Sequence, residues 1–164
     1  QKGLDDSTPW CVTLDFPSYL AVMTHADNRE LREEVYRAFA TRASDQFTHT
    51  EFDNTDLIAE IRALRHQKAQ LLGFEQYADL SLATKMAESK EQVSGFLRDL
   101  AQKSKPQAQQ ELETLKAFAK QELSLDTLAP WDVTYASEKL KNKTLSLSQE
   151  ALKPYFTVEK ALAG

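Results

Sequence analysis

The chain has 164 residues, which is enough for one ordinary domain with a hydrophobic core. Hydrophobic residues make up 41% of it and charged residues 27%, a composition typical of globular proteins rather than of disordered or fibrous ones. The net charge of −5, without a cluster of Lys and Arg, argues against nucleic-acid binding, and no apolar run approaches the ~20 residues of a membrane span.

The first predicted element is a short, half-buried strand over residues 10–16. Hydrophobic side chains alternate there with small or polar ones, which is the period-two pattern of a strand. Nothing later in the sequence resembles a partner strand, so we expect this strand to pair with chain outside residues 1–164. Pro17 then begins a short helix that reaches about His25.

A second helix is predicted after this one. Asp27 or Asn28 can cap its N-terminus, and Glu33 and Arg37 stand one helical turn apart, where they can form an ion pair. The polar residues 44–53 predict a loop.

The clearest helix begins at Asn54 or Thr55 and ends before Gly73, which suits the left-handed position after a helix. Two further helices are predicted behind the Ser89 to Gln92 capping box and from Pro106 onward. Hydrophobic residues recur at helical spacing on these helices and are expected to form the core: Leu57, Ile61, Leu64, Leu71, Val93, Leu97, Leu100, Leu112 and Leu115.

The last third of the chain predicts three more helices. One spans about residues 131–143, a shorter one lies between Ser148 and Pro154, and one begins after Thr157. Because the chain stops soon after this last start, we expect residues 1–164 to be a cut from a longer protein.

Residues that could carry chemistry are scarce. A protease-type zinc site needs two histidines one helical turn apart with a Glu beside the first, and His25, His49 and His66 do not meet this requirement. The single cysteine, Cys11, is expected to be a small packed side chain and agrees with a reducing compartment such as the cytoplasm. The large aromatic residues Trp131 and Tyr135 are expected in the core rather than in a peptide channel.

Residues 10–23, Trp-Cys-Val-Thr-Leu-Asp-Phe-Pro-Ser-Tyr-Leu-Ala-Val-Met, resemble a stretch of the thimet oligopeptidase family of zinc metallopeptidases. The resemblance continues in order, without a large gap, through residues 32–39, 41–45, 60–65, 69–74, 77–87, 130–135 and 152–156.

The resemblance implies a parent enzyme with a mostly helical, two-lobed fold that hydrolyses short peptides. Its zinc ligands and general base lie on a His-Glu-x-x-His helix, with a further Glu downstream. No position of this chain matches that motif, which would lie beyond Gly164. We therefore assign no catalytic, cofactor-binding or metal-binding residue to this chain, and expect zinc only in the parent enzyme.

The sequence thus predicts an all-α, multi-helix bundle of about seven helices with one short N-terminal strand, part of a larger two-lobed peptidase. Residues 1–164 form one helical segment upstream of the catalytic helix, without an internal domain boundary. We expect a scaffold or channel-wall segment that is inactive alone and associates with itself. Short peptides are the parent's expected partners, with neither nucleic acid nor membrane. The alternative is a stand-alone helical protein-interaction module without enzymatic activity.

Overall fold

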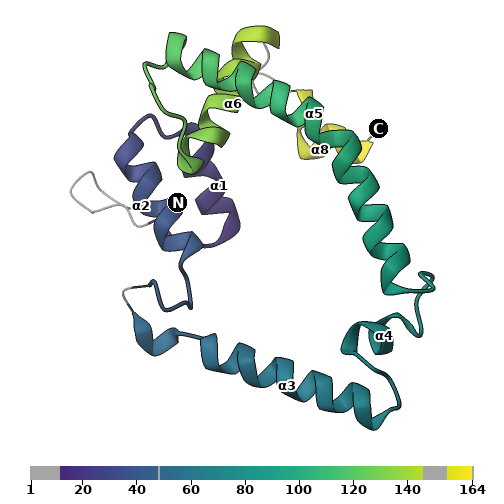
Figure 1. The fold of residues 1–164 in the computed structure, drawn as a ribbon. Helices are drawn as coiled ribbons and strands as arrows, with labels where there is room; N and C mark the ends of the chain where they lie inside the picture. Colours follow the sequence, from purple (N-terminus) through teal and green to yellow (C-terminus); the bar gives the residue numbers. More distant parts are fainter. Residues whose placement is uncertain (1–11, 48, 146–154, 164) are drawn as a thin grey trace. The chain divides into compact units, whose positions relative to one another are not determined.

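The structure is a computed structural model that describes residues 12–47, 49–145 and 155–163. These ranges contain seven α-helices, one 3₁₀ helix and no strand (Figure 1). The helices are α1 (Phe16–His25), α2 (Arg29–Ala40), η1 (Thr50–Phe52), α3 (Thr55–Leu71), α4 (Tyr77–Leu82), α5 (Lys90–Glu122), α6 (Pro130–Leu145) and α8 (Val158–Ala163). The predicted all-α class is confirmed.

The predicted strand over residues 10–16 is not seen. Residues 10 and 11 lie outside the described ranges, residues 12–15 are not in a strand, and Phe16 is already the first residue of α1. Asp15 caps this helix by accepting a hydrogen bond from the Ser18 amide at 3.4 Å, and Pro17 lies in the first turn. A helix forms here because its cap comes from neighbouring residues, whereas a strand would need a distant partner.

Several predicted helix ends are confirmed. The Leu31 amide donates to Asn28 Oδ1 at 3.0 Å, so Asn28 rather than Asp27 caps α2. The Gln92 amide donates to Ser89 Oγ at 3.1 Å at the start of α5, and Thr157 precedes α8. Gly73 has a φ of +82° and follows α3, where the Phe74 amide reaches back to the Ala69 carbonyl at 2.9 Å.

Contrary to the prediction, Pro106 does not begin a separate helix. It lies inside α5, which runs for 33 residues from Lys90 to Glu122. A proline there removes the amide that would bond to the Gln102 carbonyl. Because Gln102 is exposed, water can satisfy that carbonyl and the helix continues. The helix predicted between Ser148 and Pro154 falls outside the described residues.

The chain divides into two compact units, one made of Gln1–Phe39 and Glu113–Gly164 and the other of Ala40–Leu112, with the division inside α5. The first unit has a small core in which Leu115 and Ala119 of α5 and Ala136 of α6 are buried. Four half-buried leucines, Leu123, Leu125, Leu128 and Leu140, pack around this core.

The second unit has no comparable core. Ala69 is the one buried hydrophobic residue in its described part, where α4 lies against α3. Of the nine residues predicted to form the core, Leu115 is buried and Val93 is half-buried. The other seven are exposed, so that prediction was wrong for them: Leu57, Ile61, Leu64, Leu71, Leu97, Leu100 and Leu112. Helical spacing identifies an apolar face but not whether another element of the same chain covers it.

Candidate functional site

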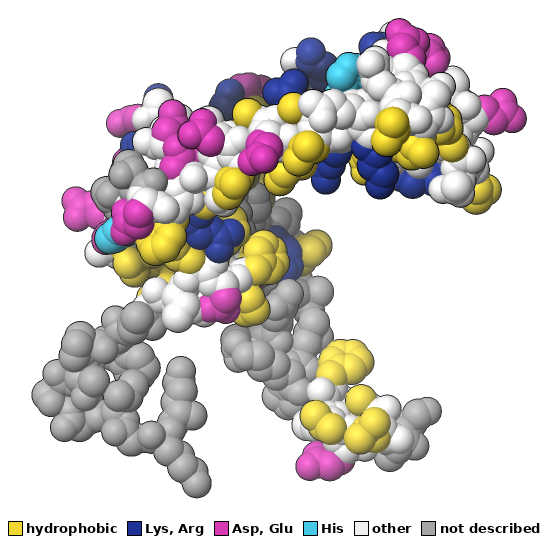
Figure 2. All heavy atoms as spheres, turned by 90° about the horizontal axis from the view of Figure 1, so that it is seen from below, with side chains coloured by type: hydrophobic (Ala, Val, Ile, Leu, Met, Phe, Trp, Pro, Cys, Tyr) yellow, Lys and Arg dark blue, Asp and Glu magenta, His cyan; other side chains and the backbone are white. Residues whose placement is uncertain are grey.

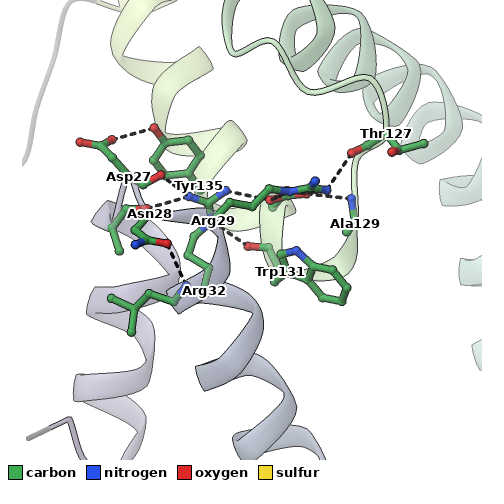
Figure 3. Close-up of polar contacts among 11 residues, drawn as sticks. Asp27, Asn28, Arg29, Arg32, Thr127, Ala129, Trp131 and Tyr135 are labelled. Atoms are coloured by element: carbon green, nitrogen blue, oxygen red, sulfur yellow. Dashed lines mark hydrogen bonds and ion pairs between the residues drawn. The ribbon is translucent and has the colours of Figure 1, made fainter.

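The densest set of polar contacts joins the N-terminal ends of α2 and α6 (Figure 3). Arg29 and Arg32 lie in the first turns of α2, and Asp132 lies in the first turn of α6. We call these three side chains the Arg–Asp cluster.

Asp132 lies at the centre of the Arg–Asp cluster and is completely buried. Arg29 Nη2 contacts its Oδ2 at 2.8 Å, and Arg32 Nη2 contacts its Oδ1 at 2.8 Å. The Ala129 amide donates to Oδ2 at 3.0 Å, which also caps the start of α6. A negative charge at a helix N-terminus is favourable, and Asp132 supplies one at the start of α6. Positive charges at a helix N-terminus are unfavourable, so Asp132 also offsets the charges of the two arginines at the start of α2.

Arg32 is the second buried charge, with 1% of its surface exposed. Its Nε donates to the Trp131 carbonyl at 3.2 Å, and its Nη1 donates to the Ala26 carbonyl at 2.7 Å and the Asp27 carbonyl at 3.2 Å. The guanidinium carbon also lies 4.0 Å from the centre of the Tyr135 ring, close enough for a cation–π contact. Arg32 thereby fixes the turn between α1 and α2 against α6.

A second group of contacts continues along α6. Tyr135 Oη donates to Asp27 Oδ1 at 2.7 Å, and Lys139 Nζ lies 3.0 Å from the same oxygen. These two donors lower the pKa of Asp27, the Tyr135 hydrogen bond contributing most. Burial, with the Asp27 contact, raises the pKa of Tyr135, while the hydrogen bond to Asp27 raises the pKa of Lys139.

The ionisation of Asp132 follows from its partners. Burial acts to raise its pKa, but hydrogen bonds from Arg29, Arg32 and the Ala129 amide outweigh burial, so the pKa is lowered from its ordinary value. The carboxylate is therefore charged at neutral pH, and both of its oxygens already accept hydrogen bonds. Asp132 thus joins the N-terminal ends of α2 and α6 through charged hydrogen bonds.

An open groove of about 530 Å³ runs between α1 and α6. Its apolar side comes from Pro17, Leu20 and Ala21 of α1, and its polar side includes Glu138 and Lys141 of α6, which form an ion pair at 3.0 Å. His25 and Ser137 also line the groove, but no hydrogen bond joins these two side chains, and the described residues group no set of metal ligands there.

Each histidine is described within its own unit. His25 ends α1 beside the groove, His49 lies 3.3 Å from Glu51 in an exposed turn, and His66 is exposed on α3. Cys11 lies outside the described residues. In the described part of the chain, no three His, Cys, Asp or Glu side chains are grouped to hold a metal ion.

Trp131 and Tyr135 take part in packing, as expected. Trp131 lies against Tyr36 at 5.9 Å between ring centres, and Tyr135 is buried. Sequence reasoning missed the Arg–Asp cluster, because Arg32 and Asp132 are 100 residues apart and no spacing rule links them.

The family model described as peptidase family M3 matches residues 22–164. This chain belongs to peptidase family M3. Oligopeptidase A of Escherichia coli is 56% identical to it over 156 residues, which are 94% of this chain and 23% of that protein. Oligopeptidase A of Haemophilus influenzae is 48% identical over 153 residues (93% and 22%), and a probable cytosolic oligopeptidase A of Arabidopsis thaliana is 46% identical over 159 residues (96% and 22%).

The resemblance to an M3 oligopeptidase is therefore confirmed along nearly the whole chain. The chain spans less than a quarter of the length of these relatives. Among the described helices, none combines the length and the apolar character needed to cross a bilayer.

Proposed function

We propose that this chain is a segment of the helical scaffold of a longer M3 zinc metallo-oligopeptidase that hydrolyses short peptides. The observation that carries the proposal is the 56% identity to an oligopeptidase A over 94% of the chain. At this similarity the local packing of the parent is expected to be retained.

The scaffold role is supported by how the segment uses its polar groups. The buried charges Arg32 and Asp132 satisfy one another and fix the helices α2 and α6 together. The described residues do not fit a zinc ion, since they offer no grouped ligand set. We therefore place the zinc site and the catalytic residues of the parent outside them, and propose that residues 1–164 come from upstream of the catalytic helix as one segment.

The test compares two purified polypeptides, the 164-residue chain and the longer product of its gene. The short chain should hold no stoichiometric zinc after extensive dialysis and should not cleave a quenched fluorescent peptide. The longer polypeptide should retain zinc and cleave the same peptide. Zinc retained by the short chain, or turnover that survives its repurification, would contradict the scaffold role.

The stand-alone interaction module is the second candidate, favoured by the exposed apolar side chains of the Ala40–Leu112 unit. It predicts that the gene product has no peptidase activity, so the same assay separates the two functions.

We further propose a cytoplasmic location. The single cysteine supports it, as does the name of the cytosolic Arabidopsis relative, although another Arabidopsis relative is named chloroplastic/mitochondrial. Fractionation of the source cells, followed by immunoblotting, tests this location.

A further inference from the structure

One exposed apolar face of the Ala40–Leu112 unit lies on α3. Leu57, Ile61, Leu64 and Leu71 are 54%, 47%, 55% and 88% exposed. Figure 2 shows hydrophobic side chains, in yellow, exposed on the face of the molecule turned toward the viewer. Large apolar side chains in a row along one helix usually mark an interface.

The spacing of these residues defines what can cover them. Leu57, Ile61, Leu64, Lys68 and Leu71 follow one another at intervals of four, three, four and three residues, which is the a/d pattern of a helix that packs along another helix. We call these five residues the α3 seam. The pattern favours a single α-helix, lying nearly along α3, as the occupant.

Helix α4 does not occupy this face. Arg65 lies over the Tyr77 ring at 5.2 Å, and Ala69 is buried, so α3 uses the side that carries these two residues to contact α4. At 100° per residue that side is centred about a quarter turn away from the α3 seam. The α3 seam therefore stays open within its own unit.

Lys68 adds a chemical requirement. It is the fourth of the five seam residues and is exposed, and it makes no ion pair within the residues that the structure describes. A lysine at a core position of a helix pair is costly unless its ammonium reaches a carboxylate or solvent. The occupant should thus present apolar residues with an Asp or Glu opposite Lys68.

A second copy of this chain fits the seam poorly. Helix α3 has 17 residues, so it is about 25 Å long. Two such helices with a contact strip ~10 Å wide would bury roughly 500 Å² in total, well below the ~1,200–2,000 Å² of stable protein interfaces. Two Lys68 side chains would also add like charges to the contact.

We propose that the α3 seam binds an amphipathic helix, carrying a carboxylate opposite Lys68, from the part of the polypeptide that lies outside residues 1–164. The relatives supply ample chain for this, because the aligned segment is 23% of the E. coli protein. The inference rests on the proposed function only in taking the segment to belong to a longer polypeptide. It adds that the α3 seam is a covered face of the scaffold and that an amphipathic helix covers it.

The experiment places a cysteine on the α3 seam and a matched one on the opposite side of α3. Leu64→Cys tests the seam, and His66→Cys, exposed and about half a turn away, is the control. Each variant is made in the full-length gene product and in the 164-residue chain. Maleimide labelling is followed by mass spectrometry on the peptide that contains α3.

In the full-length polypeptide, the Leu64→Cys thiol should react at least about tenfold more slowly than the His66→Cys thiol, because it reacts only on local opening. In the dilute 164-residue chain the two thiols should react at similar rates. Similar rates in the full-length polypeptide would overturn the proposal. Protection that already exists in the dilute short chain would overturn the choice of occupant.

Hydrogen exchange on the unsubstituted proteins guards against misfolded variants, since α3 should exchange more slowly in the full-length polypeptide than in the short chain. Neither readout depends on peptide hydrolysis. A full-length polypeptide that protects the α3 seam but cleaves no peptide would refute the proposed function and leave this inference intact.

Discussion

At the scale of single residues, Asp132 decides how α2 and α6 are joined. It is completely buried and pairs with Arg32, which is almost as buried, and with the more exposed Arg29. Two buried opposite charges are costly to bring out of water, and their attraction offsets this cost only while both are present. The cluster should therefore contribute specificity of packing more than net stability.

Asp132→Asn should lower the free energy of unfolding of the 164-residue chain by about 3–5 kcal/mol, because it leaves the buried Arg32 without a counter-charge. Urea unfolding followed by circular dichroism measures the change. Asp126→Asn, at an exposed position, is the matched control and should change the unfolding free energy by less than about 0.5 kcal/mol. Equal effects of the two substitutions would show that the Arg–Asp cluster does not hold the unit together.

The same residue predicts a pH dependence. The pKa of Asp132 is lowered in the folded chain, so its contribution is present above its unfolded pKa of about 4 and is lost as the pH falls through the folded pKa. The stability difference between the unsubstituted chain and Asp132→Asn should thus be largest near neutral pH and shrink below about pH 4. A difference that stays constant from pH 7 to pH 3 would contradict this assignment.

At the scale of elements, the helices begin and end where their local sequence directs them. Asn28, Ser89 and Gly73 each act through hydrogen bonds to residues within a few positions of themselves. Pro106 is the exception, since it lies in an uninterrupted helix. Ser104 Oγ donates to the Leu100 carbonyl at 2.8 Å just before it, a contact that is compatible with a bend.

Pro106→Ala should stabilise the middle of α5 locally by about 1–3 kcal/mol, because it restores an amide that can bond to the Gln102 carbonyl. Hydrogen exchange at residues 102–110 measures the gain as slower exchange. Gln109→Ala, which leaves the backbone bonding unchanged, is the control and should have little effect. If Pro106→Ala does not slow exchange, the break predicted from the sequence would be the better description.

At the scale of the whole molecule, the described part of the chain buries few hydrophobic side chains. Six of its seven buried hydrophobic residues lie in the unit of Gln1–Phe39 and Glu113–Gly164, and three of them, Leu115, Ala119 and Ala136, form one cluster. In the described part of the Ala40–Leu112 unit only Ala69 is buried. A unit without a core of its own depends on another surface to cover its apolar face.

The isolated 164-residue chain should therefore associate with itself weakly. Light scattering over a concentration series should show an average mass that rises with concentration, since the α3 seam alone buries too little area for a tight dimer. Ile61→Glu, on the seam, should reduce the association, whereas Gln70→Glu, on the same helix but off the seam, should not. A mass that stays monomeric up to the solubility limit would contradict the prediction.

The sequence by itself determined the family, the all-α class and most helix ends, because caps and helical periodicity act between residues a few positions apart. It also determined that α3 has an apolar face, through the spacing of Leu57, Ile61 and Leu64. Tertiary structure alone decided that Arg32 meets Asp132, 100 residues away, and that α3 lies uncovered while Leu115 is buried. Burial and long-range pairing depend on which residues lie opposite a side chain in space, and the neighbouring residues in the sequence do not determine this.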